Sequence, residues 1–203
     1  MAFSSPFWSP SEASAVLFDW DGVIADTKLD FSGVRQKYFG DRPAMLLEDA
    51  RTLPPELREA LMRDLEELEV RGARNAALVP GVSKILEWVK SAGIPWAVVS
   101  RNCRKSILTA AEMIGVKLPE IVRSRDDGER VKPDPAALRE VCAALGADAG
   151  QTLLIGDYIY DMMGARRAGM RGVLVRNEIR DGWDDWLECH YKSMDEFYDA
   201  LVN

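Results

Sequence analysis

The stretch AVLFDWDG, residues 15–22, opens with four apolar residues and then becomes acidic. A continuous apolar run of this kind is typical of a strand buried on both faces, as in a parallel sheet. The run ends at Asp19, and Asp21 follows two positions later, just before the turn-forming Gly22. The sequence therefore predicts a buried strand over residues 15–18, with two carboxylates directly beyond its carboxyl end.

Apolar runs and helical patterns alternate along the rest of the chain. Further apolar runs occupy residues 94–99, 121–122, 152–155 and 171–175. The helical stretches between them cover residues 81–91, 104–114, 135–145 and 158–168, each followed by a glycine near its end. This alternation predicts an α/β fold, a three-layer Rossmann-like parallel sheet with helices on both faces.

Residues 27–78 interrupt this alternation. They contain no convincing strand pattern, and over residues 54–71 leucines recur at helical spacing among many charged residues. We interpret the segment as a small helical cap inserted after the first strand, with hinges near residues 23–28 and 78–81. The alternative is a long helix pair packed on the sheet. The predicted domains are a Rossmann-like catalytic core, residues 1–26 and 79–203, and a cap, residues 27–78.

Composition excludes several classes of protein. The chain has 26 basic and 33 acidic residues, a net charge of −7, which disfavours binding to a nucleic-acid backbone. No apolar run approaches the roughly 20 residues that span a bilayer. The three cysteines are scattered without a CxxC pair, which suits a reducing compartment. We therefore expect a cytoplasmic protein with no nucleic-acid or membrane partner, and the sequence leaves both monomer and homodimer open.

Charged and polar side chains gather where the predicted strands end. Because ligands bind beyond the carboxyl ends of the strands in open α/β sheets, these side chains are candidates for a site. Asp19 and Asp21 follow the first strand, and Ser100, Arg101 and Asn102 follow the run at 94–99. Asp157 follows the run at 152–155, Asp161 lies one helical turn further on, and Lys132 precedes the helix at 135–145.

This set of residue types favours phosphoryl chemistry. Four carboxylates close together repel one another, and a hard divalent cation such as Mg²⁺ relieves that repulsion. Lys132 adds a compact positive charge and Ser100 a hydrogen-bond donor, which together suit a phosphoryl group. Each piece also has a purely structural interpretation: Asp134 and Pro135 make a good helix start, for example, which would leave Lys132 an ordinary loop lysine. A GxxxxGK loop and a GxGxxG fingerprint are both absent.

The same residues carry a resemblance to a known family. Residues 18–27, FDWDGVIADT, resemble the first motif of the haloacid dehalogenase superfamily of phosphohydrolases. Ser100 resembles the second motif, Lys132-Pro133-Asp134-Pro135 the third, and Gly156-Asp157 with Asp161 the fourth. The resemblance covers about residues 14–26 and 80–176. A helical cap after the first motif is similar to the phosphoglycolate phosphatase and β-phosphoglucomutase branch.

The resemblance implies a role for each site residue. Asp19 would be the nucleophile and a Mg²⁺ ligand, and Asp21 would be the general acid and base, with its backbone carbonyl on the metal. Ser100, Arg101, Asn102 and Lys132 would bind the phosphoryl group or substrate, with Ser100 and Lys132 also counted as catalytic. Asp157 and Asp161 would complete the metal site. Arg101 departs from the pattern expected of the second motif, and it could reach either the substrate or the cap.

The implied function is a Mg²⁺-dependent phosphatase of a small phosphorylated metabolite, acting through an aspartyl-phosphate. A phosphomutase of a sugar phosphate is the nearest alternative. A receiver-like phosphorylatable signalling domain is a third, although the order of the motifs argues against it. In a receiver domain the acidic pair lies on the first strand and the phosphorylated aspartate comes later, whereas here Asp19 and Asp21 follow the first strand and a second carboxylate pair comes after the lysine. In the cap, which is shorter than usual for the branch, Lys28, Arg35 and Arg42 are candidates for contact with an anionic substrate.

Overall fold

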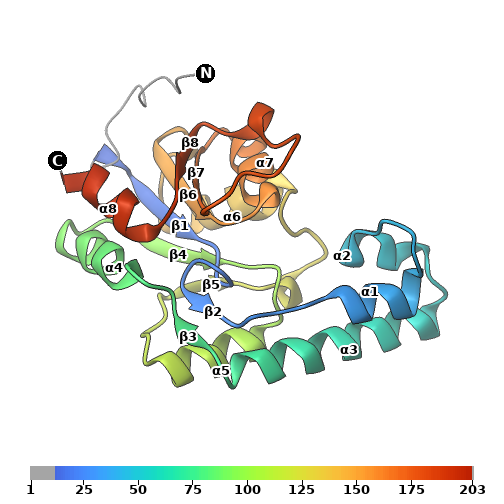
Figure 1. Ribbon diagram of the computed structural model, residues 1–203. Coiled ribbons are helices and arrows are strands. Elements are labelled where there is room, and N and C mark those ends of the chain that lie inside the picture. The colour runs from blue at the N-terminus through green and yellow to red at the C-terminus, as the bar shows by residue number, and fades with distance from the viewer. Residues whose placement is uncertain (1–11, 203) are drawn as a thin grey trace.

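A single parallel sheet forms the centre of the protein (Figure 1). The computed structural model describes residues 12–202. The sheet has six strands in the order β5-β4-β1-β6-β7-β8. Their bounds are β1 (Ala15–Phe18), β4 (Trp96–Val99), β5 (Ile121–Arg123), β6 (Thr152–Gly156), β7 (Arg171–Val175) and β8 (Cys189–Tyr191). Because β1 pairs with both β4 and β6, the residues that follow it lie at the middle of the sheet edge.

Helices cover both faces of the sheet. They are α4 (Val82–Ser91), α5 (Arg104–Ile114), α6 (Pro135–Leu145), α7 (Ile159–Ala168) and α8 (Met194–Val202). Along β1 the side chains alternate: Val16 and Phe18 pack with residues of α4, α5 and α8, whereas Leu17 packs with residues of α6 and α7. The three-layer α/β arrangement predicted from the sequence is confirmed.

Most of the predicted elements are present, with two informative differences. The strand predicted over residues 94–99 begins at Trp96, because the Ile94 amide still closes helix α4 on the Val89 carbonyl and Pro95 has no amide hydrogen to donate. The short edge strand β8 was not predicted, since three residues with a histidine in the middle give no strand pattern. The first eleven positions assigned to the core lie outside the described residues, as does Asn203.

The inserted segment folds into helices that pack on one another and on the core. They are α1 (Ser32–Phe39), α2 (Leu46–Asp49), the 3₁₀ turn η2 (Ala50–Thr52) and α3 (Pro55–Ala73). A separate apolar cluster joins them, with Leu61 and Leu65 of α3 buried in it, whereas Leu57 is 49% exposed. Helix α3 also packs on α5 of the core. This separate cluster supports the division into core and cap, which stays a prediction.

The chain crosses between core and insertion on two paired segments. Strands β2 (Ala25–Asp26) and β3 (Ala77–Leu78) form a two-stranded antiparallel ribbon. The prediction that residues 27–78 contain no strand was therefore wrong for β3. Two residues are too few to give a pattern, and the strand exists only through its pairing with β2. Among residues 12–202, no helix combines the length and the apolar character that crossing a membrane requires.

Candidate functional site

The loop after β1 places the side chains of Asp19 and Asp21 at the same cavity. The amide of Asp19 donates to the Ile155 carbonyl of β6 at 2.8 Å, which continues the sheet by one residue. The chain then turns sharply, with the amides of Ile24 and Ala25 donating to the Trp20 carbonyl at 2.9 and 3.0 Å. Trp20 is fully buried, while the aspartates on either side of it line a cavity.

Gly22 allows this turn and also allows a close approach to Asp157. Its φ of +77° lies in the left-handed region that favours glycine. A Cβ at this position would lie 2.6 Å from Oδ2 of Asp157, so the Asp157 carboxylate would have to move. The glycine therefore lets the loop after β1 meet the loop after β6.

The Asp21 carboxyl is held by one neighbouring residue. Its Oδ1 accepts hydrogen bonds from the Thr27 amide, at 3.1 Å, and from the Thr27 hydroxyl. Burial raises the pKa of Asp21 to about 6; the Thr27 hydrogen bonds oppose this, and the negative charge of Asp19 adds to it. A carboxyl group with a pKa near neutrality can both give and take a proton at physiological pH.

Lys132 is buried between two carboxylates of the site. Its side chain is 1% exposed, and its Nζ is 2.7 Å from Oδ1 of Asp19 and 2.6 Å from Oδ1 of Asp161. Burial alone would lower the pKa of Lys132, but the charges of Asp161 and Asp19 outweigh burial and raise it. The lysine is therefore a fixed positive charge that orients Asp19.

Asp161 folds back over the end of β6. Its Oδ2 accepts from the Tyr158 amide at 3.1 Å, so the carboxylate also caps α7. This position requires Gly156, because a Cβ there would lie 2.3 Å from the Asp161 side chain. Burial raises the pKa of Asp161 to about 6, against the effect of Lys132.

Three of the four predicted carboxylates form one group. Asp19, Asp157 and Asp161 each offer an oxygen, and these oxygens all lie within 4.8 Å of one another. Burial, followed by the charges of Asp19, Asp161 and Asp21, raises the pKa of Asp157 to about 8. The Asp21 carboxylate is not in this group, which leaves its backbone carbonyl as the predicted ligand. Lys132 is the buried cation between Asp19 and Asp161, and one lysine does not neutralise three carboxylates. A donor set made only of oxygen atoms, with negative charge in excess, fits Mg²⁺.

Ser100 and Asn102 supply hydrogen-bonding groups beside the carboxylates. Ser100 is held after β4 by donating its amide to the Arg123 carbonyl at 2.8 Å, and its Oγ accepts from the Asn102 amide at 3.1 Å. The side-chain nitrogen of Asn102 is buried and has no partner among residues 12–202. Both residues line the cavity, so both are available to an anionic ligand there.

Arg101 contacts the cap. Its guanidinium donates to both carboxylate oxygens of Glu48 in α2, at 2.7 and 2.9 Å. It also donates to the Lys132 carbonyl and lies 4.6 Å from the ring centre of Tyr160. Of the two partners that the sequence allowed, the structure selects the cap, although Arg101 still lines the cavity.

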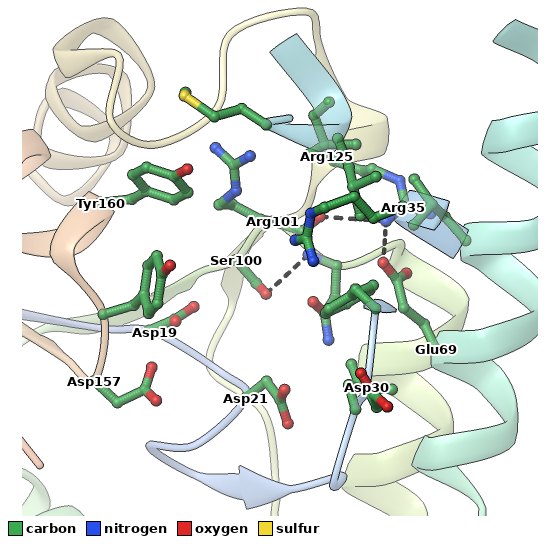
Figure 2. Close-up of a pocket in the computed structure, with 18 of the residues that line it drawn as sticks. Asp19, Asp21, Asp30, Arg35, Glu69, Ser100, Arg101, Arg125, Asp157 and Tyr160 are labelled. Carbon is green, nitrogen blue, oxygen red and sulfur yellow. Dashed lines mark hydrogen bonds and ion pairs between the residues drawn. The ribbon is translucent and has the colours of Figure 1, made fainter. Parts of the chain in front are cut away.

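Apart from Lys132, which is buried between Asp19 and Asp161, the site residues predicted in the core line a cavity of about 410 Å³ between core and cap (Figure 2). Asp19, Asp21 and Asp157 lie on its core side. Of the three cap cations proposed from the sequence, Arg35 lines it, whereas Lys28 and Arg42 are exposed elsewhere. Lining residues that the sequence did not indicate include Glu69, Arg125, Tyr158 and Tyr160. Apart from the position of Tyr160 next to Asp161, no local signal marks them.

Comparison with known proteins gives one family and several relatives. The model of a family described as haloacid dehalogenase-like hydrolase matches residues 35–175. A pyrophosphatase, PpaX, of Halalkalibacterium halodurans is 27% identical over 83% of this chain and 86% of its own. The N-acetylmuramic acid 6-phosphate phosphatase of Pseudomonas aeruginosa is 30% identical over 80% of this chain and 81% of its own. Among solved structures, a hydrolase from Pseudomonas syringae covers 92% of this chain and 97% of its own, with a TM-score of 0.76 and 20% identity.

Proposed function

The chain belongs to the haloacid dehalogenase-like hydrolases, as a phosphoric monoester hydrolase of that family, and from this premise we propose that it hydrolyses a small phosphorylated metabolite with the aid of Mg²⁺. We propose further that the reaction passes through an aspartyl-phosphate on Asp19. One observation carries the proposal above all others. Lys132 is buried between Asp19 and Asp161, with the Asp157 carboxylate beside them, at the edge of a cavity large enough for a small ester.

Asp19 is the proposed nucleophile. The ion pair between its Oδ1 and Lys132 fixes the orientation of the carboxylate and leaves Oδ2 to attack phosphorus. A bond forms between this oxygen and phosphorus, and the bond from phosphorus to the ester oxygen breaks. The alkoxide that leaves takes its electron pair with it and needs a proton.

Asp21 is the proposed source of that proton. Its carboxyl lines the cavity two residues from Asp19, and the two hydrogen bonds from Thr27 hold it there. In the second half of the reaction, Asp21 takes a proton from water, the water oxygen attacks phosphorus, and the bond to Asp19 breaks. Asp19 and Asp21 are then restored, with inorganic phosphate as the product.

The remaining groups bind the phosphoryl oxygens and the metal. The proposed phosphate ligands are Ser100 Oγ, the side-chain nitrogen of Asn102, which has no hydrogen-bond partner within residues 12–202, and Lys132, which lies beside Asp19. Asp19, Asp157 and Asp161, with the backbone carbonyl of Asp21, would hold Mg²⁺. The bound ion would offset the negative charge of the phosphoryl group during transfer. Residues 27–78 are proposed to cover the site, and residues 12–26 and 79–202 to form the catalytic core.

A screen of phosphorylated metabolites for released inorganic phosphate tests this proposal. We expect release from small monoesters with Mg²⁺ present, no release in excess chelator, and no release by Asp19→Asn under either condition. Full activity in excess chelator would overturn the metal assignment. Conversion of a sugar phosphate into its isomer, without phosphate release, would favour a phosphomutase instead.

A further inference from the structure

Two of the places where the cap is attached to the core differ in character. At the first, the carboxyl-terminal half of α3 is fixed to the loop after β4. Glu69 is 2% exposed, forms an ion pair with Arg125 and accepts from the Cys103 amide at 2.8 Å. The Ser106 hydroxyl donates to the Glu69 carbonyl at 3.2 Å. Glu69 and Arg125 line the catalytic cavity, but their side chains are only 2% and 5% exposed, so opening this attachment would break a buried ion pair.

At the second place, α2 meets the core through two arginines at the protein surface. Arg101 holds Glu48 in a bidentate pair whose side chains are 20% and 32% exposed. Arg51, just after α2, donates to the Glu129 carbonyl at 3.0 Å. Because water reaches both contacts, α2 can separate from the core at a much lower cost than α3 can.

The Glu48–Arg101 pair stands between two cavities. Arg101 lines the catalytic cavity beside Ser100 and Tyr160 (Figure 2). Glu48 lines a second, more open cavity of about 1240 Å³, on the other side of α2, which the loop at residues 128–135 borders. Met45 and Leu47 line both cavities. Separation of the pair would therefore join the two spaces.

We propose that Glu48, acting through Arg101, sets an upper limit on the size of the alcohol part of the substrate. With the pair formed, the catalytic cavity of about 410 Å³ is closed on the side of α2 and admits a compact phosphate ester. With the pair broken, the alcohol part extends past Arg101 into the second cavity. The proposal rests on the proposed function, and it makes Glu48 a positioning residue, since its carboxylate faces Arg101.

The test compares phosphate esters of equal charge and increasing size. The probes are glycerol 3-phosphate, a hexose 6-phosphate and a nucleoside 5′-monophosphate, and kcat/KM is measured for each with Mg²⁺ present. The wild type should prefer the smallest ester. Glu48→Lys, which repels Arg101, should raise the ratio of the nucleotide to the glycerol ester by about tenfold, and Glu48→Gln should raise it less.

Glu66 provides the matched control. It also joins cap and core, through Lys105 at 3.0 Å, but it does not line the catalytic cavity. Glu66→Lys and Glu66→Gln should leave the size ratio unchanged. If Glu48→Lys and Glu48→Gln have the same nucleotide-to-glycerol ratio as the wild type, the proposed size limit is wrong. It is also wrong if the Glu66 variants shift this ratio as much as the Glu48 variants do.

A binding measurement separates failure of the proposed size limit from failure of the proposed function. Calorimetry with the same esters on Asp19→Asn, with and without Glu48→Lys, needs no turnover. We expect the second substitution to strengthen nucleotide binding relative to glycerol 3-phosphate by about the same factor as in the kinetic test. If the wild type hydrolyses none of the esters, the proposed function is wrong. If Asp19→Asn has the same binding ratio with and without Glu48→Lys, the proposed size limit is wrong.

Discussion

Within residues 12–202, two groups of charged side chains differ in their balance of charge. In the catalytic group, Lys132 faces Asp19 and Asp161, with Asp157 beside them. In the other, Glu69 and Arg125 pair one to one between cap and core. The first group has an excess of negative charge and the second has none. An excess that the protein itself does not neutralise points to a ligand of opposite charge, while a balanced pair is sufficient for structure.

The pKa values of the catalytic group express that excess. Burial and the neighbouring carboxylates raise the pKa of Asp157 to about 8, although Arg176 lies 3.6 Å away and opposes the shift. A buried pair that is broken on one side, in contrast, leaves a charge without a partner and costs stability. Substitutions in the first group should therefore change chemistry and metal binding, and substitutions in the second should change stability.

The largest effect is expected for Asp19→Asn. The amide keeps the shape of the carboxylate but is a far weaker nucleophile, so turnover should fall by about 10⁴-fold or more, as for other lost nucleophiles. Circular dichroism should show an unchanged fold. Phosphate release at more than a hundredth of the wild-type rate would exclude Asp19 as the nucleophile.

Asp21→Asn should have the next largest effect, a loss of about 10²- to 10⁴-fold, which is the usual contribution of general acid and base catalysis. An aryl phosphate with a good leaving group needs little protonation, so the variant should still phosphorylate Asp19 and then release phosphate slowly. Rapid mixing should show a burst, and mass spectrometry should find the phosphoryl adduct on Asp19. An adduct elsewhere would contradict both assignments.

Glu69→Gln should mainly destabilise the protein, because Arg125 then stays buried without a counter-charge. The free energy of unfolding should fall by about 3–5 kcal/mol in a denaturant titration. Glu66→Gln, one turn away on α3 and in an exposed pair with Lys105, should cost only about 0.2–1 kcal/mol. Equal losses in the two variants would remove the distinction between the buried and the exposed pair.

Asp157→Asn should have the smallest effect of the four, seen as a weaker response to metal. The Mg²⁺ concentration for half-maximal activity should rise by at least about 10- to 100-fold, because that is the usual loss of metal affinity when even a residue that only supports a ligand is changed. In the wild type, Mg²⁺ should also raise the melting temperature, and in Asp157→Asn this increase should be smaller. Glu69→Gln should leave the Mg²⁺ requirement as it is in the wild type, and a joint shift would mean that the two groups are coupled.

The predicted core followed from patterns that act locally. An apolar run such as residues 15–18 specifies a buried strand by itself, and the alternation with helices specifies a parallel sheet. The cap was harder to predict. The helical spacing of its leucines predicted a helix, but it did not tell the buried Leu61 and Leu65 from the exposed Leu57. Strand β3 was missed because a two-residue strand depends wholly on its partner.

The sequence by itself determined which chemical groups meet at the edge of the sheet. Parallel strands all end on the same side, so residues directly after them, such as Asp19, Ser100 and Asp157, converge whatever the details of packing. Only the tertiary structure decided the contacts between cap and core. Glu48 lies 53 positions from Arg101, and Glu69 lies 56 from Arg125, in segments that no local pattern relates. Those pairs depend on how α2 and α3 are placed over the sheet, and that placement comes from packing summed over many residues.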